Sequence, residues 1–289
     1  MSKTKKAKTP KAKAKVTKPV VQIFAPPATG PKVLVFDIET APIIAHVWGL
    51  WDNNVGLNQI VSDWHVLSWS AKWLDAPENE VMYMDQRGLK NIEDDKKLLQ
   101  HIWNLLDTAD IVITQNGVKF DQKKLNARFI MNDLTKPSSF RHIDTAKIAK
   151  KHFAFTSNKL AYMTDKLCTK YKKLTSHGAF AGHELWTQCL KDNILAWQEM
   201  EKYNKYDVLS LEELYHKLIP WDSTIDFSVY TDEEKKVCTC GSESFTKNGF
   251  SFTNAGKYQK FKCKNKKCGK EHKGKINLFS QVKKDSLKQ

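Results

Sequence analysis

The sequence contains no apolar run that approaches the roughly 18–20 residues needed to cross a bilayer. Its N-terminus is rich in lysine but lacks the apolar stretch of a secretory signal. These absences predict a protein that is neither embedded in a membrane nor exported, and we expect it in the cytoplasm. The 289 residues, of which 41% are hydrophobic, leave room for one large globular domain or two smaller ones.

Acidic side chains are missing from residues 1–32, which contain nine lysines and carry a net charge of +9. The segment 230–289 also carries +9, whereas residues 33–229 carry −3, within a total of +15. Two basic appendages therefore flank a slightly acidic body. A basic excess of this size indicates a polyanionic partner, most often nucleic acid.

Residues 1–31 lack apolar periodicity and repel one another through their lysines, which predicts a disordered tail. This tail serves either as an arm that attracts phosphates, as a solubilising segment or as a targeting sequence. After it we expect a body at 32–222, a linker at 223–236, a cysteine-bearing module at 237–279 and a second tail at 280–289.

The body alternates between apolar segments typical of buried strands and segments whose apolar residues have helical spacing. Strands are predicted at 33–36, 66–73, 81–84 and 111–114, helices at 92–109, 120–131 and 194–218, and a further short segment at 142–151. Strands followed by helices that alternate with a strand favour an α/β fold, in which helices cover a mixed sheet.

Two carboxylates stand close together at the end of the first predicted strand. Asp37 and Glu39 are two residues apart, so their side chains point to the same face of the sheet. Such a pair repels unless it shares a proton or a cation, and hard oxygen ligands favour Mg²⁺ or Mn²⁺. The alternative is a pair that faces solvent at a strand edge.

Two further acids, Asp121 and Asp207, lie on predicted helices of the body. Asp121 follows a predicted strand and begins a helix, where the helix dipole alone would favour an acid. Asp207 lies on the last long helix, one turn after Tyr203 and on the same face. Taken singly, Asp121 is more typical of an ordinary helix start, and Tyr203 with Asp207 is more typical of a surface or boundary pair.

Taken in order, the three patterns resemble the motifs of the DEDD exonuclease superfamily, in the branch that carries a tyrosine. They are Asp37-x-Glu39, Asn116-x-x-x-Phe120-Asp121 and Tyr203-x-x-x-Asp207. The second is most similar to the proofreading domain of family B DNA polymerases and its stand-alone relatives. The resemblance spans about 32–220 and implies a ribonuclease H-like fold, a mixed five-stranded sheet flanked by helices.

The resemblance also implies a chemistry and a site. The four acids would hold two Mg²⁺ or Mn²⁺ ions, which activate a water and stabilise the leaving 3′ oxygen. Tyr203 would orient that water, because a phenol with an ordinary pKa near 10 is a better hydrogen-bonding guide than a base. Thr40, Asn116 and Phe120 would border the terminal nucleotide, although Phe120 is equally typical of a core residue.

Four cysteines near the C-terminus form two close pairs, separated by 22 residues: Cys238 with Cys240, and Cys263 with Cys268. Paired thiolates on two turns suit one structural Zn²⁺, and the arrangement looks like a zinc ribbon. Disulfides are the alternative, which an intracellular chain rarely keeps. Because the cysteine spacings depart from the usual one, His272 is a candidate substitute ligand.

The same module interleaves lysines with aromatic side chains, which is typical of nucleic-acid contact through phosphates and stacking. Docking to a protein, or a purely stabilising role, is the alternative. A module of this size has too little core to fold without the metal.

Two groups of residues near the motifs are read as structural. The connection 43–65 is rich in aromatic residues, including Trp48, Trp51 and Trp64, and we predict a hydrophobic cover over the sheet edge, with base stacking as the alternative. No metal-ligand spacing links His142, His177 and His183, so we predict structural or surface roles for them.

The expected function is a metal-dependent 3′–5′ exonuclease that releases nucleoside 5′-monophosphates, with DNA favoured over RNA. The alternatives are an exoribonuclease, a structure-specific endonuclease and an idle nucleic-acid-binding protein that keeps the fold. Replication or recombination proteins are candidate partners besides nucleic acid. A compact, lysine-rich exonuclease would also suit a phage or other virus, acting inside the host cell.

Overall fold

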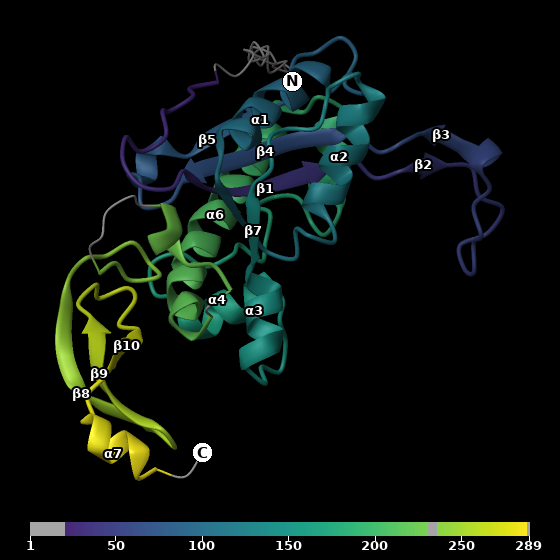
Figure 1. Cartoon of the computed structure of the whole chain (residues 1–289). Helices are drawn as coiled ribbons and strands as arrows, with labels where there is room; N and C mark the ends of the chain where they lie inside the picture. Colours follow the sequence, from purple (N-terminus) through teal and green to yellow (C-terminus); the bar gives the residue numbers. More distant parts are fainter. Residues whose placement is uncertain (1–20, 223, 231–235, 288–289) are drawn as a thin grey trace, which may run out of the picture.

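A computed structural model describes residues 21–222, 224–230 and 236–287 (Figure 1). Most of the predicted N-terminal tail, and part of the predicted linker, therefore lie outside the described residues. No helix within the described ranges is long and apolar enough to cross a membrane.

A five-stranded sheet occupies the centre of the body. Its strands are β1 (Val33–Thr40), β4 (Val66–Trp73), β5 (Met82–Asp85), β6 (Ile111–Thr114) and β7 (Arg141–Asp144). They lie in the order β5-β4-β1-β6-β7, with β4 antiparallel to β1 and β5, and β6 parallel to β1 and β7. The predicted mixed five-stranded sheet is confirmed, and β7 is the strand hidden in the short segment predicted at 142–151.

Helices cover both faces of the sheet, as the predicted fold requires. They are α1 (Lys96–Thr108), α2 (Asp121–Met131), α3 (Thr145–His152), α4 (Leu160–Leu167), α5 (Glu184–Leu190) and α6 (Ile194–Leu218). The apolar residues of α1 and α2 pack on one face, and those of α3, α4 and α6 pack on the other.

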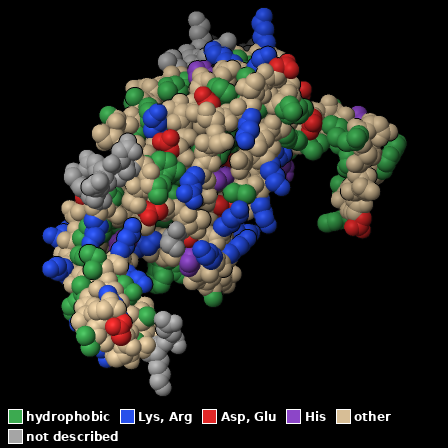
Figure 2. Space-filling model, viewed as in Figure 1, with side chains coloured by type: hydrophobic (Ala, Val, Ile, Leu, Met, Phe, Trp, Pro, Cys, Tyr) green, Lys and Arg blue, Asp and Glu red, His purple; other side chains and the backbone are tan. Residues whose placement is uncertain are grey.

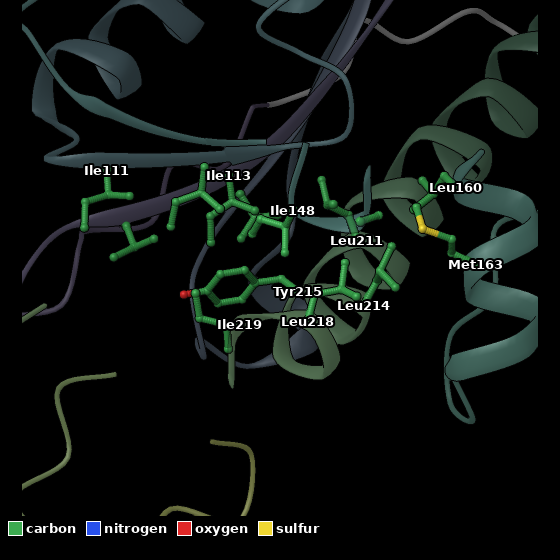
Figure 3. Packing of buried hydrophobic residues seen from close by; sticks show 14 of the residues in the cluster. Ile111, Ile113, Ile148, Leu160, Met163, Leu211, Leu214, Tyr215, Leu218 and Ile219 are labelled. Atoms are coloured by element: carbon green, nitrogen blue, oxygen red, sulfur yellow. The ribbon is translucent and has the colours of Figure 1, made fainter. Parts of the chain in front are cut away.

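The alternation of side chains along β1 decides which face each residue joins. Leu34, Phe36 and Ile38 are buried with α1 and α2, whereas Val33 and Val35 are buried against α6. Figure 3 shows this second cluster, in which Leu211, Leu214 and Tyr215 of α6 face Ile111 and Ile113 of β6. Asp37 and Glu39 continue the series of Val33 and Val35, so the pattern that builds the core also aims both acids at α6.

The C-terminal module is a three-stranded antiparallel sheet, in the order β10-β9-β8. Its elements are β8 (Phe245–Thr253), β9 (Gly256–Cys263), β10 (Glu271–Asn277) and the short helix α7 (Gln281–Asp285), which lies within the predicted second tail. Lys267 forms an ion pair with Asp75, and the Lys270 ammonium donates to the Asp222 carbonyl at 2.6 Å. Asp75 follows β4 beside the start of β1, so the module contacts the end of the sheet away from Glu39.

Two segments predicted to be tail or linker pack against the body instead. Val21 and Phe24 lie against the α1 side of the core, and the Trp73 indole donates to the Phe24 carbonyl at 2.9 Å. Ile225 and Phe227 are buried in the α6 side of the core. The many charged residues of the predicted tail and linker indicated segments exposed to solvent, but these apolar side chains fill gaps at the edges of the core.

The aromatic residues of the connection between β1 and β4 predicted a cover over the sheet edge, and this prediction is wrong. It forms a two-stranded hairpin, β2 (Ile44–Ala45) with β3 (Ile60–Ser62), that extends away from the body (Figure 1). Trp48 and Trp51 are 100% and 86% exposed, so neither belongs to a core of the described chain.

Candidate active site

Three carboxylates converge between the end of β1 and the middle of α6. Asp37 and Glu39 come from β1 and Asp207 from α6, and one carboxylate oxygen of each lies within 4.8 Å of those of the others. Asp207 is only 2% exposed, although it carries a formal charge. The structure therefore brings three of the four acids singled out in the sequence close together.

Asp121 lies beside these three carboxylates but is not among those whose oxygens lie within 4.8 Å of one another. It is the first residue of α2, is 3% exposed, and its Oδ1 accepts a hydrogen bond from the Ile38 amide at 3.2 Å. Its charge acts on Asp37 and on Glu39. The bond to Ile38, which lies between those two residues, fixes Asp121 at the edge of the carboxylate group.

Burial raises the pKa of all four acids, because the charged form loses its water. The pKa of Glu39 rises to about 8, that of Asp121 to about 7 and that of Asp207 to about 6. The pKa of Asp37 also rises well above its ordinary value, through burial and then through the charges of Asp207, Asp121 and Glu39. The four carboxylates therefore lack sufficient positive charge among their described neighbours.

A divalent cation fits this arrangement. Asp207 Oδ1 is buried and has no hydrogen-bond partner among the described residues, so one ligand atom points into the group unsatisfied. Clustered carboxylate oxygens are the donors that Mg²⁺ and Mn²⁺ prefer. A shared cation would also offset the burial, and the repulsion between neighbouring acids, that raise these pKa values.

Comparison with known proteins places the body in a family. The model of the RNase_H superfamily matches residues 70–219, which is half of the chain. The chain belongs to the RNase_H superfamily. The matched range includes Asp121, Tyr203 and Asp207 and begins after Asp37 and Glu39.

A search of curated proteins returned no match. Among solved structures, the family B DNA polymerase of the hyperthermophilic archaeon Pyrobaculum calidifontis is similar over 69% of this chain, at 15% identity and a TM-score of 0.47. The similarity covers 26% of the polymerase chain, so this chain spans about a quarter of that protein.

One lysine enters the carboxylate group of this RNase_H superfamily chain, and sequence reasoning missed it. Lys173 forms an ion pair with Asp207, and its ammonium lies 4.3 Å from the centroid of the Tyr203 ring. Burial lowers the pKa of Lys173, but the charges of Asp207, Tyr203 and Asp37 and the hydrogen bond to Asp207 together outweigh burial and raise it. Lys173 lies in a lysine-rich loop after α4, where nothing in the sequence distinguishes it from its neighbours.

Two further side chains hold the acids in place and were also missed. The Asn204 amide donates to Asp37 Oδ2 at 2.7 Å, and the Trp186 indole donates to Glu39 Oε2 at 2.9 Å. Asn204 directly follows Tyr203 on α6 and is fully buried. A buried polar side chain needs a hydrogen-bond partner, so a polar residue next to Tyr203 in the helix is the signal that could have identified it. Trp186 comes from the short helix α5, whose position no local pattern specifies.

Tyr203 stands at the border of the group within an aromatic cluster. Its ring centroid lies 4.7 Å from that of His177 and 5.9 Å from that of Trp186. Burial, and then the charge of Asp207, raise the pKa of the phenol above its ordinary value. His177 therefore packs beside the site, as a structural residue, while the Tyr203 hydroxyl keeps its proton.

The three residues predicted to border a terminal nucleotide lie at the same end of the sheet. Thr40 is half-buried at the end of β1, and Asn116 is exposed in the turn after β6 with a φ of 62°. Phe120 is 42% exposed directly before Asp121, which excludes the core role that was its alternative. These positions leave all three free to meet a ligand that approaches the carboxylates.

Removing the positive charge of Lys173 is expected to destabilise the protein when divalent ions are absent. Lys173→Met leaves Asp207 buried without its cation, which should lower the free energy of unfolding by about 2 kcal/mol. The loss is smaller than for a fully buried pair because the ammonium is partly exposed. For a domain of this size that lowers Tm by roughly 4–8 °C. Thermal melts in buffer free of divalent ions measure the change.

The neighbouring lysine supplies the control. Lys172 pairs with Asp165 at the surface, where both side chains are half-exposed, so Lys172→Met should leave Tm almost unchanged. Added Mg²⁺ or Mn²⁺ should raise Tm more in Lys173→Met than in the unaltered protein. Equal shifts for the two lysine variants would contradict the role given to Lys173.

The four cysteines of the C-terminal module form a second candidate metal site. Their sulfur atoms all lie within 4.8 Å of one another, with 3.7 Å between Cys238 and Cys268 and 3.8 Å between Cys240 and Cys263. All are free thiols, and His272 Nε2 lies 3.0 Å from the sulfur of Cys238. The cluster is compatible with a zinc ribbon, with His272 at its border.

Proposed function

We propose that this chain is a metal-dependent 3′–5′ exonuclease of the tyrosine-bearing DEDD branch, acting on DNA and preferably on single strands. The observation that carries the proposal is the convergence of Asp37, Glu39 and Asp207, with Asp121 beside them, at one end of an RNase_H-superfamily sheet. Hydrolysis from the 3′ end would release nucleoside 5′-monophosphates.

The four acids would hold two Mg²⁺ or Mn²⁺ ions, which when bound supply an activated water and stabilise the leaving 3′ oxygen. Asn204 and Trp186 keep the carboxylates of Asp37 and Glu39 oriented through the hydrogen bonds that they donate. Because the Tyr203 hydroxyl keeps its proton, it acts as a donor that orients a water or a phosphate oxygen.

Thr40, Asn116 and Phe120 would contact the terminal nucleotide, with the exposed Phe120 ring as a stacking surface for a base. In the C-terminal module, Cys238, Cys240, Cys263 and Cys268 would hold one structural Zn²⁺. Ammonium groups there lie over exposed rings, as Lys257 does at 4.0 Å from the Phe250 centroid. This mixture suits contact with phosphates and bases, and we assign the module to nucleic-acid binding.

The activity is tested with 5′-labelled oligonucleotides of DNA and of RNA, single- and double-stranded, in Mg²⁺ or Mn²⁺. We expect a ladder that shortens from the 3′ end, fastest on single-stranded DNA, and nucleoside 5′-monophosphate as the product. A closed circular single strand should remain intact. Cutting of the circle would show an endonuclease, and absence of cleavage with every substrate would leave only a binding protein.

Tyr203→Phe is expected to slow turnover while leaving metal binding largely unchanged. Phenylalanine keeps the ring contacts with His177 and Trp186 and removes only the hydroxyl. Loss of one hydrogen bond to a charged group predicts a fall of about 10- to 100-fold in the single-turnover rate. The Mn²⁺ concentration for half-maximal rate is measured in parallel, and an unchanged rate would remove Tyr203 from the site.

A further inference from the structure

The hairpin between β1 and β4 concentrates exposed apolar side chains more than any other described part of the chain. We call residues 42–64 the arm. Nine large hydrophobic residues within it are more than a third exposed, including Trp48, Leu50, Trp51 and Leu57, each at least 86% exposed. In Figure 2 hydrophobic side chains line the projecting arm, whereas lysine and arginine side chains dot the body.

The apolar area of the arm is too large for a segment that stays in water. The nine side chains together expose roughly 800 Å², which exceeds the largest apolar patch of a typical monomer, about 300–600 Å². Since the arm extends away from the body, no fold of the described chain covers this area. Some other molecule must therefore cover it.

The charge of the arm argues against nucleic acid as that molecule. Residues 41–65 contain no Lys or Arg and two acids, Asp52 and Asp63, in a chain with 47 basic residues. Binding to a phosphate backbone depends on cationic side chains. The arm therefore fits a protein surface, in contrast to the lysine-rich C-terminal module.

A second copy of this chain fits the arm best. Interfaces between identical subunits are more apolar than other interfaces and are depleted of lysine at their centre, as the arm is. A two-stranded hairpin is marginally stable alone and presents two free edges, and a twofold axis brings the same edges together. Two arms together offer up to about 1,600 Å² of apolar surface, the size of a standard specific interface.

We propose that the arm joins two copies of the chain, hairpin against hairpin, about a twofold axis. Each arm leaves the body at Ala41, two residues after Glu39. The paired arms therefore bring the carboxylate ends of the two sheets toward one another, rather than the C-terminal modules.

Light scattering coupled to gel filtration tests this at micromolar protein and about 0.5 M salt, where electrostatic association is screened but apolar contact persists. The unaltered protein should elute with the mass of two chains. Trp48→Ser combined with Trp51→Ser should yield single chains and weaken association about 100-fold or more. Ile130→Ser, which removes a 76% exposed apolar residue from α2, should remain paired.

Because neither tryptophan contributes to the core, the double tryptophan variant should stay folded, with the far-UV circular dichroism spectrum of the unaltered protein. A single-chain mass for the unaltered protein, or a pair that survives in the double tryptophan variant, would overturn the proposal. So would a single-chain protein whose oligonucleotide binding falls in the double variant, since nucleic acid would then be the occupant. These readouts do not depend on nuclease activity, so they test the proposed pairing independently of the proposed function.

Discussion

Asp37→Asn is expected to lower exonuclease activity by at least about 1,000-fold while making the metal-free protein more stable. Burial, and then the charges of all three other acids, raise the pKa of Asp37 well above its ordinary value. An amide in its place cannot serve as an anionic ligand, and losing one electrostatic contact to the reacting centre alone costs about 10²–10³ in rate. Removing one of four like charges also relieves their repulsion.

The opposite signs of these two effects separate a lost ligand from a damaged fold. Asparagine can still accept the hydrogen bond that Asn204 donates to Asp37, so the packing is preserved. Single-turnover rates and melts without divalent ions, followed by titration with Mn²⁺, give the three quantities needed. Asp165→Asn, an exposed acid outside the group, is the matched control. An active Asp37→Asn protein would refute the assignment of the four acids.

Cys238→Ser is expected to eliminate bound zinc and unfold the C-terminal module while the body stays folded. The buried cluster of this module consists of Cys238, Cys263 and Cys268, with only Cys240 and Phe245 packed against it. So small an apolar core cannot hold three strands together, whereas structural zinc contributes about 10–16 kcal/mol in comparable small modules. We expect one zinc per chain before the substitution and none after it.

Metal analysis and limited proteolysis measure this result together. The variant should be cut after the body, and it should bind long oligonucleotides more weakly. Cys168→Ser, which alters a buried thiol of the body, should retain its zinc. His272 lies close enough to Cys238 to replace it, so the double variant Cys238→Ser with His272→Ala decides the matter. Stoichiometric zinc in that double variant would contradict the proposed ligand set.

The parts of the site that lie on regular elements could be predicted from the sequence. Asp37 and Glu39 follow the strand periodicity of β1, and Tyr203 and Asp207 follow the helical periodicity of α6, so local spacing fixes where each side chain points. The core that holds these elements follows the same two periodicities. Asp121 is tied to the start of a helix, and its distance from the other acids depends on how α2 packs.

The parts that were missed depend on contacts between segments far apart in the chain. Lys173 reaches Asp207 from a loop, and Trp186 reaches Glu39 from 147 residues away. No pattern in one sequence distinguishes these residues from other lysines and tryptophans. The arm was misread because aromatic residues usually enter a core, and composition cannot show which surface they will meet.

The C-terminal module is attached at the end of the sheet opposite the carboxylates. Asp75, its partner in the body, lies beside Val33, and Glu39 stands six positions further along β1, a distance of about 20 Å. At about 3.4 Å per nucleotide, that span matches roughly six nucleotides of a stacked strand. Under the proposed function, lysines held so far from the scissile bond would not act on its cleavage directly. They would set instead how many nucleotides leave before the strand is released, so substitutions in the module would change processivity and leave the rate of the chemical step unchanged.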